Sequence, residues 1–444
     1  MADFKPIIGL EIHIELKTKT KMFCRCPANY FGHEPNTHCC PVCLGLPGAL
    51  PVPNKQAIDW VILTGLAFNC QINKFSKFDR KNYFYPDLPK GYQISQYDLP
   101  LAVGGELKIK SSKLKVRIRR VHLEEDTAKL FHQPGENSSL IDFNRSGVPL
   151  MEIVTEPDIE SSLQAKEFLK QIQQIIRYLD ISDCDMEKGS MRLEANISVS
   201  KTAKLPNYKV EVKNLNSFRF VEKAIEYEIN RQTEILKAGK TPIQETRGWD
   251  EKRQVTYSQR IKEEANDYRY FPEPDIPPMR LLDSDINTLR ERLPEMPDKK
   301  KARFSHEYGL SNYYTQILTV SKSLSDYFEE AVIMGKKYHI SSLQIANQII
   351  NKKININAIS ATWLIKTLNQ KSQKPNVSVK DLTKIIIQVI EENQSAVADF
   401  KKGKSEVLGF LIGQVMRNSK GQADAKQVRK IFMEKLNTAK LKNG

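Results

Sequence analysis

Several features are missing from this 444-residue sequence, and each absence excludes a class of protein. No run approaches the roughly 18 uninterrupted apolar residues that a membrane-spanning helix needs, so a membrane-spanning protein is excluded. The first residues, MADFKPIIGLEIH, carry no basic segment followed by an apolar core and a cleavage site. We therefore expect a cytoplasmic protein without a cleaved leader.

Two common catalytic motifs are also absent. The sequence contains no Gly-x-Ser-x-Gly motif, which leaves hydrolytic nucleophile chemistry with little support. Its Gly-Lys-Ser triplet, Gly403-Lys404-Ser405, has Ala398 where a phosphate loop requires its first glycine, and no strand pattern precedes it. Any ATP must therefore be bound by another architecture, such as a metal held by carboxylates on a sheet.

Cysteine is scarce outside one short segment. Of seven cysteines, five fall between Cys24 and Cys43. An odd, clustered set in a chain without a secretion signal argues against a disulfide framework. A metal site is the better hypothesis.

The clustered cysteines form two closely spaced pairs with thirteen residues between them. The four are Cys24, Cys26, Cys40 and Cys43. This spacing predicts a tetrahedral zinc site with a structural role, because four thiolates leave no coordination position open. Unrelated reduced thiols are the alternative. Within the zinc hypothesis, Cys39 could replace Cys40, and His33 or His38 could displace one thiolate.

Positive charge exceeds negative charge, with 68 Lys and Arg against 53 Asp and Glu and a net charge of +15. This balance favours polyanionic partners such as nucleic acids. From Asp381 to the end there are 12 basic and 7 acidic residues, which gives +5 in 64 residues. The C-terminal segment is therefore predicted to be a basic helical module.

Short alternating apolar and polar runs, typical of half-buried strands, dominate the chain up to about residue 290. Helical periodicity interrupts them around 163–179 and 220–236. We expect an α+β fold in which helices pack on an antiparallel sheet, followed by two all-α modules. Breaks at the Pro-rich stretch 271–278 and at 373–376 predict domains at 1–292, 293–376 and 377–444.

The first predicted strand carries a row of ionisable side chains. Glu11, His13 and Glu15 occupy alternate positions, so they share one face while Leu10 and Ile12 cover the other. For one strand taken alone, a solvated polar face is the alternative.

Similar positions recur on later strands. They are the run His122-Leu123-Glu124-Glu125-Asp126, then Arg192, Glu194 and Asn196, then Glu211 and Lys213. If these strands are neighbours, their acids converge. Oxygen-rich clusters of this kind hold Mg²⁺, which prefers carboxylates, water and nucleotide phosphates.

Longer motifs run along nearly the whole chain. They are DRKNYFYPDLPKGYQISQ at 79–96, IGLEIH at 8–13, DFNRSGVPLMEIV at 142–154, DYRYFPEPD at 267–275, GFLIGQVM at 409–416 and SKGQA at 419–423. Together they closely resemble the B subunit of the bacterial aspartyl/glutamyl-tRNA(Asn/Gln) amidotransferases.

The resemblance implies an enzyme component that works with an amidase, the A subunit, and with a small C subunit. The amidase would release ammonia from glutamine. This chain would use ATP to phosphorylate the side-chain carboxylate of Glu or Asp mischarged on tRNA, and ammonia would displace the phosphate. The N-terminal cradle would be similar to the glutamine synthetase and guanidino kinase fold, which binds ATP without a phosphate loop.

The resemblance also implies roles for individual residues. Those that look like the Mg²⁺ and ATP shell are Glu11, His13, Glu125 and Glu211, with Glu124 close by. Those that look like the end of the ammonia path are Lys81, Lys90 and Glu125. The cysteine pairs are present in only some family members, and the helical segment 293–376 looks short for the family.

Two other functions use part of the same features. A free-standing carboxylate-amine ligase would need the cradle but not the basic tail. A non-catalytic tRNA-binding scaffold would need the tail and the cysteine pairs but not the acidic row. For the amidotransferase, the substrate is Glu-tRNA(Gln), Asp-tRNA(Asn) or both.

Overall fold

The computed structural model describes residues 4–438 except 133, 134, 136, 203, 262–267, 373–377, 405, 420 and 422. The described part contains thirteen helices and sixteen strands, which confirms the α+β class. Across these residues, the helices are all too short or too polar to cross a membrane. Ser405, the predicted boundary near 377, and Asp267, Lys420 and Gln422 of two motifs lie outside the described residues.

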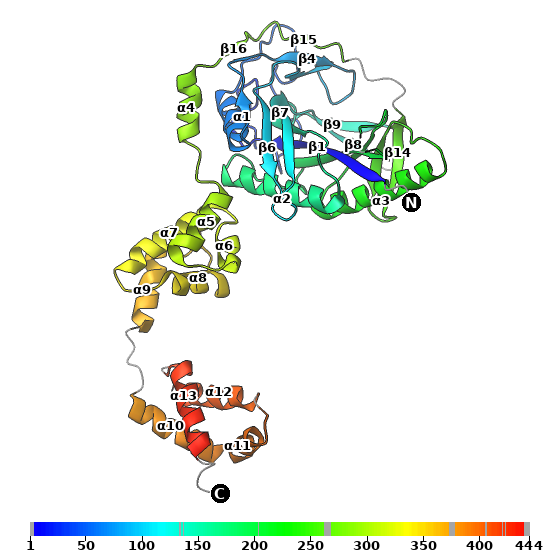
Figure 1. Cartoon of the computed structure of the whole chain (residues 1–444). Coiled ribbons are helices and arrows are strands. Elements are labelled where there is room, and N and C mark those ends of the chain that lie inside the picture. Colours follow the sequence, from blue (N-terminus) through cyan, green and yellow to red (C-terminus); the bar gives the residue numbers. More distant parts are fainter. Residues whose placement is uncertain are drawn as a thin grey trace. The chain divides into compact units, whose positions relative to one another are not determined.

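A nine-stranded sheet organises the N-terminal part of the chain (Figure 1). In spatial order its strands are β14 (Val255–Ile261), β13 (Glu245–Asp250), β12 (Val210–Lys213), β11 (Met191–Ser200), β1 (Lys5–Glu15), β10 (Pro149–Thr155), β7 (Lys115–Glu125), β6 (Ala102–Lys108) and β2 (Gln71–Ile72). Neighbours are antiparallel except β12 and β13, which are parallel. A long helix between β12 and β13 carries the chain back to the end of the sheet at which β12 begins, so the two strands run in the same direction.

Apolar side chains on one face of the sheet form the core. In β1, Leu10, Ile12 and Ile14 are at most 1% exposed and share one core with side chains of the packed helices. Burying one such side chain stabilises the fold by roughly 1.5–3 kcal/mol. The alternation predicted for this strand therefore fixes which face remains for polar groups.

Three helices pack on the sheet. The helices α2 (Ser162–Tyr178) and α3 (Phe218–Lys237) confirm the two predicted helical segments and contact each other along the sheet (Figure 1). Each begins at a serine whose hydroxyl accepts a backbone N–H, which satisfies a donor that the first turn leaves unpaired. The third, α1 (Lys55–Ala67), packs on β6 and β7.

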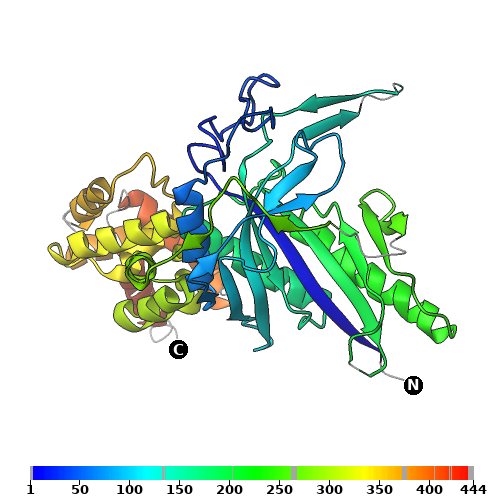
Figure 2. The ribbon, with the colours of Figure 1, turned by 90° about the horizontal axis from the view of Figure 1, so that it is seen from above.

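Smaller strand groups surround the sheet. They are β4 (Asp79–Asn82) with β5 (Tyr92–Ser95) and β15 (Phe271–Pro272), β3 (Phe75–Ser76) with β16 (Met279–Arg280), and the hairpin of β8 (Lys129–His132) and β9 (Ser139–Asp142). Figure 2 shows this hairpin extending away from the sheet, beside the long loop that follows β1. Arg80 of β4 makes a bidentate ion pair with Glu273, at 2.7 and 2.8 Å, which joins the distant 79–96 and 267–275 motifs.

Helices make up the rest of the described chain. Their bounds are α4 (Asp283–Glu291), α5 (Pro297–Tyr308), α6 (Asn312–Leu318), α7 (Lys322–Lys336), α8 (Ser342–Asn351), α9 (Ala361–Ser372), α10 (Val379–Glu392), α11 (Gln394–Lys401), α12 (Val407–Asn418) and α13 (Ala425–Thr438). The chain divides into two compact units, Met1–Asp326 and Tyr327–Gly444. The predicted boundary near 293 falls between α4 and α5, and the three-domain division stays a prediction.

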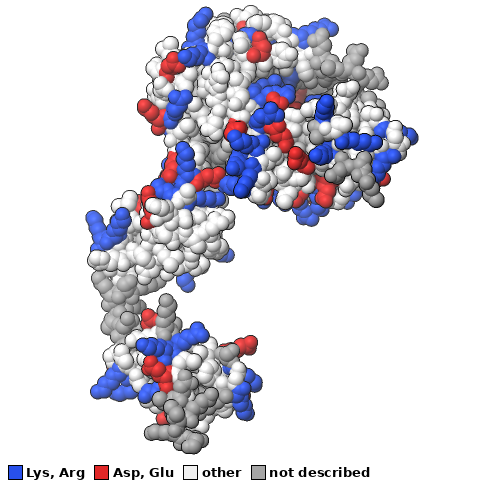
Figure 3. All heavy atoms as spheres, in the orientation of Figure 1, with Lys and Arg blue, Asp and Glu red and all other residues white. Residues whose placement is uncertain are grey.

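The last four helices share an apolar core of their own. Leu382, Ile386, Leu411 and Phe432 are fully buried in it. Basic side chains of this module point outward (Figure 3). Those that the structure describes as exposed, from α10 onward, are Lys380, Lys384, Lys402, Lys404, Arg417, Arg429, Lys430 and Lys435.

Candidate functional site

The polar face of the large sheet gathers ionisable side chains from neighbouring strands. Directly opposed residues on antiparallel strands project from the same face. The register pairs His13 with Glu152 of β10, Glu152 with His122 of β7, and Glu11 with Glu194 of β11. The acidic strands are thus adjacent in the order β12-β11-β1-β10-β7, and their acids converge.

The first convergence is the His13 cluster, defined as His13, Glu124 and Glu152, whose ligand atoms lie within 4.8 Å of one another. Nε2 of His13 lies 3.7 Å from Glu124 and 3.8 Å from Glu152, while Nε2 of His122 lies 3.0 Å from Glu152. Burial acts to raise the pKa of Glu124 and of Glu152. The neighbouring histidines outweigh it, so the pKa of each carboxyl is lowered and both are held ionised.

The second convergence is the Glu11 cluster, defined as Glu11, Glu194 and Glu211 and also within 4.8 Å. Nζ of Lys213 lies 3.0 Å from Glu194 and 3.1 Å from Glu211, and Asn196 donates to Glu11 at 2.7 Å. Burial raises the pKa of Glu194, although the charge of Lys213 acts to lower it. The negative charges of Glu11 and Glu211 add to the rise. A further cation would relieve this repulsion.

The structure divides the predicted metal-shell residues among three places. Glu11 and Glu211 belong to the Glu11 cluster, and His13 and Glu124 belong to the His13 cluster. Glu125 belongs to neither, because it follows Glu124 in β7 and successive side chains of a strand point to opposite sides.

Two acids of these clusters, Glu152 and Glu194, are missing from the predicted metal shell. Glu194 lies on the face already recognised as acidic. Glu152 carries a signal that could have found it, since it is the only charged residue in the otherwise apolar and hydroxyl-bearing strand Pro149–Thr155. A single buried charge in such a strand needs a partner or a ligand.

Lys81, predicted at the ammonia path, lies in β4 between aromatic rings and the His13 cluster. Its Nζ sits 5.0 Å from the ring centre of Tyr268 and 5.8 Å from that of Tyr83. Burial lowers the pKa of Lys81, but the charges of Glu124 and other nearby acidic groups outweigh it and raise the pKa overall. Lys81 is therefore a fixed cation facing the acidic cluster.

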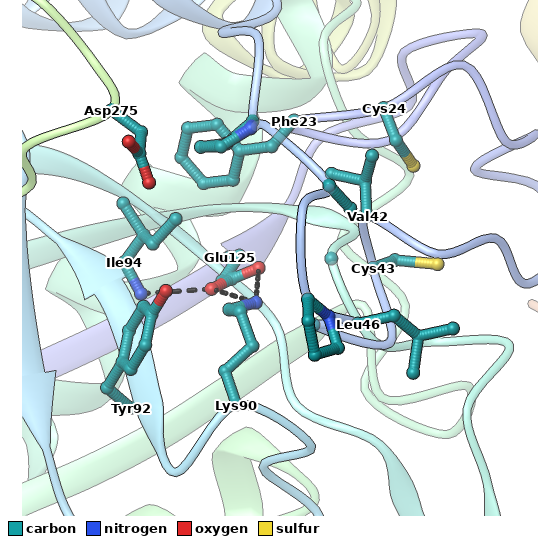
Figure 4. Close-up of a pocket in the computed structure, with 15 residues that line it drawn as sticks. Phe23, Cys24, Val42, Cys43, Leu46, Lys90, Tyr92, Ile94, Glu125 and Asp275 are labelled. Carbon is teal, nitrogen blue, oxygen red and sulfur yellow. Dashed lines mark hydrogen bonds and ion pairs between the residues drawn. The ribbon is translucent and has the colours of Figure 1, made fainter.

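Lys90 and Glu125, the other predicted ammonia-path residues, form an ion pair in a separate pocket of about 200 Å³ (Figure 4). Nζ of Lys90 lies 2.7 and 2.8 Å from the two carboxylate oxygens, and the backbone N–H of Ile94 donates to Glu125 at 3.0 Å. Apolar side chains, including Phe23 and Leu46, line the rest of the pocket. Glu125 is only 3% exposed, so this pair is shielded from bulk water.

The predicted zinc ligands come together. The four thiols of Cys24, Cys26, Cys40 and Cys43 lie within 4.8 Å of one another. Sγ of Cys40 and Sγ of Cys43 are 3.9 Å apart. A zinc tetrahedron with Zn–S bonds of about 2.3 Å has S–S edges of about 3.8 Å, so the cysteines fit such an ion.

A buried lysine supports the same interpretation. Lys21 is 1% exposed, and its Nζ lies 3.7 Å from Sγ of Cys43 and 3.3 Å from the carbonyl of Phe143. No carboxylate pairs with Lys21 among the residues that the structure describes. A buried ammonium needs an anion, and thiolates are the groups available. A hydrogen bond from Cys24, opposed by burial and aided by Lys21, lowers the pKa of Cys43 to about 4.

The alternative ligands lie outside this group. The thiol of Cys39 is 3.9 Å from the side-chain oxygen of Asn144. The rings of His33 and His38 pack on each other with centres 4.4 Å apart. Within the described part of the chain, Cys40 and not Cys39 completes the four-cysteine group.

Known proteins resemble this chain over nearly its whole length. Residues 6–287 match the GatB/GatE catalytic domain, and residues 326–436 match the GatB domain. The aspartyl/glutamyl-tRNA(Asn/Gln) amidotransferase B subunits of Caldicellulosiruptor saccharolyticus and Thermotoga maritima are each 45% identical, over 98% of this chain and 99% of theirs. That of Thermosipho melanesiensis is 47% identical, over 96% of this chain and 98% of its own. The chain therefore belongs to the family of aspartyl/glutamyl-tRNA(Asn/Gln) amidotransferase B subunits.

Proposed function

We propose that this chain amidates Glu-tRNA(Gln), Asp-tRNA(Asn) or both, in an ATP-dependent reaction that uses ammonia from a partner amidase, the A subunit. The observation that carries the proposal is the presence of two separate sites. One site is the pair of acidic clusters on the sheet face. The other is the shielded Lys90–Glu125 ion pair, whose glutamate directly follows Glu124 of the His13 cluster in β7. Amidation of a carboxylate needs one site for phosphoryl transfer and one for the attack by ammonia.

The acidic clusters suit phosphoryl transfer. Carboxylate oxygens around Glu11, Glu194 and Glu211, and around His13, Glu124 and Glu152, are the ligand types that Mg²⁺ prefers. Mg²⁺, when bound, neutralises phosphate charge during transfer. Lys213 and Lys81 would hold nearby phosphate oxygens. The substrate carboxylate attacks the γ-phosphorus of ATP, which yields an acyl phosphate and ADP.

The Lys90–Glu125 pair suits the amine step. Ammonia attacks the acyl carbon, the C–O bond to phosphate breaks, and the products are the amide and inorganic phosphate. Ammonium is not a nucleophile, so a base must take one proton before attack. Glu125 would take it, and Lys90 holds its carboxylate through two short contacts. The apolar walls keep water from hydrolysing the acyl phosphate.

The four-cysteine group would hold one Zn²⁺ with a structural role. It lies in the loop between β1 and α1, where the described residues form little regular structure. A closed tetrathiolate site would fix that loop, since binding free energy of a structural metal adds to folding free energy. It takes no part in the reaction, because it has no open coordination position.

The remaining parts would serve the tRNA and the protein partners. The outward basic side chains of the C-terminal module would contact tRNA phosphates far from the chemistry. The N-terminal unit would form a cradle similar to the glutamine synthetase and guanidino kinase fold. The working enzyme would be a heterotrimer of this chain, the amidase and a small C subunit. Charged tRNA is a cytoplasmic substrate, so we infer a cytoplasmic location.

The test compares phosphate release with amide formation in the purified heterotrimer. Glu125→Gln should continue to release phosphate from ATP with charged tRNA while amide product falls, because the base is lost but the acidic clusters remain. Glu11→Ala should lose both. If Glu125→Gln and Glu11→Ala lost both products equally, the division into two sites would be wrong. Amide formation by this chain without tRNA would favour a free-standing ligase instead.

A further inference from the structure

The second cysteine pair lies against the stem of Lys90. Cys40 to Gly45, called here the Cys40 knuckle, form a tight turn in which the N–H of Leu44 bonds the carbonyl of Cys40 at 3.1 Å. The turn ends at Gly45, which has the left-handed φ of +66° that glycine tolerates. A methyl group on Gly45 would lie 2.2 Å from Cγ and 3.3 Å from Cα of Lys90. The backbone of Gly45 is therefore the surface along which Lys90 runs.

The Cys40 knuckle also contacts Ser146 and Gly147, which lie in the loop before β10 and close to Glu125. A methyl group on Gly147 would lie 3.4 Å from Cβ of Cys43 and 3.9 Å from a carboxylate oxygen of Glu125. The hydroxyl of Ser146 donates to the carbonyl of Cys43 at 3.1 Å. The knuckle thus touches the surroundings of both members of the ion pair.

We propose that the Cys40 knuckle is a positioning element for Lys90, so that metal in the four-cysteine group sets the geometry of the Lys90–Glu125 pair. This inference rests on the proposed function for its consequence in amidation, although the positioning itself is independent of it. Gly45 and Lys90 are positioning residues here, and Glu125 is the group that meets the ammonia.

A physical reason connects metal occupancy to the lysine. A lysine side chain loses about 2 kcal/mol of rotamer entropy when it is held in one geometry, so its supporting wall must be rigid. The knuckle belongs to the long loop between β1 and α1, which has only an isolated bridge, Thr20 to Pro27, among its described residues. A four-thiolate metal cross-link would supply the rigidity that regular structure does not supply there.

The first measurement reads the position of Lys90 directly. The purified heterotrimer is acylated briefly with acetic anhydride, and modification of Lys90 is quantified by mass spectrometry relative to exposed Lys188. The side chain of Lys90 is 10% exposed and its ammonium is held by two contacts, so it should react slowly. Gly45→Ala should displace the stem and accelerate the reaction of Lys90 at least about fivefold.

Gly48→Ala is the matched control, because Gly48 lies in the same loop with a similar φ of +83° but has no atom within 4 Å of its missing methyl group. It should leave Lys90 as slow as in the wild type. Equal acceleration by both variants would assign the effect to general loop strain and overturn the proposal. Unchanged Lys90 reactivity in a folded Gly45→Ala heterotrimer would also overturn it.

The second measurement removes the metal from the wild-type heterotrimer, so it does not depend on a variant that folds. Chelation should accelerate acylation of Lys90, and added Zn²⁺ should restore slow acylation. An unchanged rate after measured metal loss would refute the link between metal and lysine.

Activity measurements then separate the positioning of Lys90 from the proposed role of the Lys90–Glu125 pair in amidation. With ammonium chloride as the amine source, Gly45→Ala should raise the KM for ammonium and lower the amide formed per phosphate released, while the KM for ATP stays unchanged. A wild-type heterotrimer that makes no amide would contradict the proposed function, whereas the Lys90 reactivity would still decide the positioning. A rise in both KM values would indicate a general structural defect and count against the proposal.

Discussion

The burial of Lys21 leads to a quantitative prediction about the zinc site. Its ammonium is 1% exposed and lies 3.7 Å from Sγ of Cys43. A Zn²⁺ ion with four thiolates carries a net charge of −2, so the ammonium of Lys21 would offset half of this charge. Lys21→Met removes the charge but keeps a long apolar stem, which makes it a conservative change for packing.

The expected loss follows from that distance. Two unit charges 3.7 Å apart attract by about 4.5 kcal/mol at an effective dielectric constant of 20. The cost of keeping an ammonium out of water offsets much of this attraction. Removal of a partner just outside the ligand set usually weakens metal binding about 10- to 100-fold. We therefore expect the Kd for Zn²⁺ to rise by that factor, which corresponds to about 1.4–2.7 kcal/mol.

The assay is competition for Zn²⁺ between the full-length chain and a chelating dye. Lys19→Met is the control, because it removes the same charge two residues away from an exposed side chain. Equal Zn²⁺ affinities for the two variants would refute the charge-compensation argument.

Three further predictions concern other parts of the chain. Glu152→Gln or Glu194→Gln should lower amidation at least about 100-fold without weakening tRNA binding. The control Glu156→Gln, just past the end of β10, should retain activity. Normal amidation by either cluster variant would remove that glutamate from the proposed site. Burial raises the pKa of Glu15 to about 8, so the folded state keeps a proton that the unfolded state releases, and the free energy of unfolding should fall from about pH 4.5 to 8 by at most about 1.4 kcal/mol per pH unit. Glu15→Gln should flatten that decline in urea titrations, and an unchanged slope would contradict the assignment. Deleting residues 378–444 should reduce the slope of log K for tRNA against log salt by about 0.7–0.9 for each lost phosphate contact, and an unaltered slope would argue against a tRNA-binding tail.

Much of the polar face could be predicted from alternation alone. Glu11 and His13 share a face in any β-strand, and the apolar partners Leu10 and Ile12 decide that this face is not the core. The helices at 162–178 and 218–237 also follow from local periodicity. Such features depend on neighbours within a few positions, so one sequence contains the information.

Long-range packing accounts for what the sequence did not predict. Lys21 lies in the polar run LKTKTKM, which looks like an exposed segment, and its burial arises only because the loop folds over the turn at Phe143. The parallel pairing of β12 with β13 depends on where α3 returns the chain. The contact between Gly45 and Lys90 joins residues 45 positions apart, and no periodic pattern relates them.

The separation of Glu124 from Glu125 shows how one strand can serve two steps. Their side chains leave β7 on opposite sides, so Glu124 meets the histidines of the sheet face while Glu125 meets Lys90 and the N–H of Ile94. β5 contacts both, because Ser95 donates to Glu124 while Ile94 donates to Glu125. In the proposed reaction, the base that deprotonates ammonia is therefore kept off the metal-binding face, so it does not serve as a metal ligand while it takes the proton.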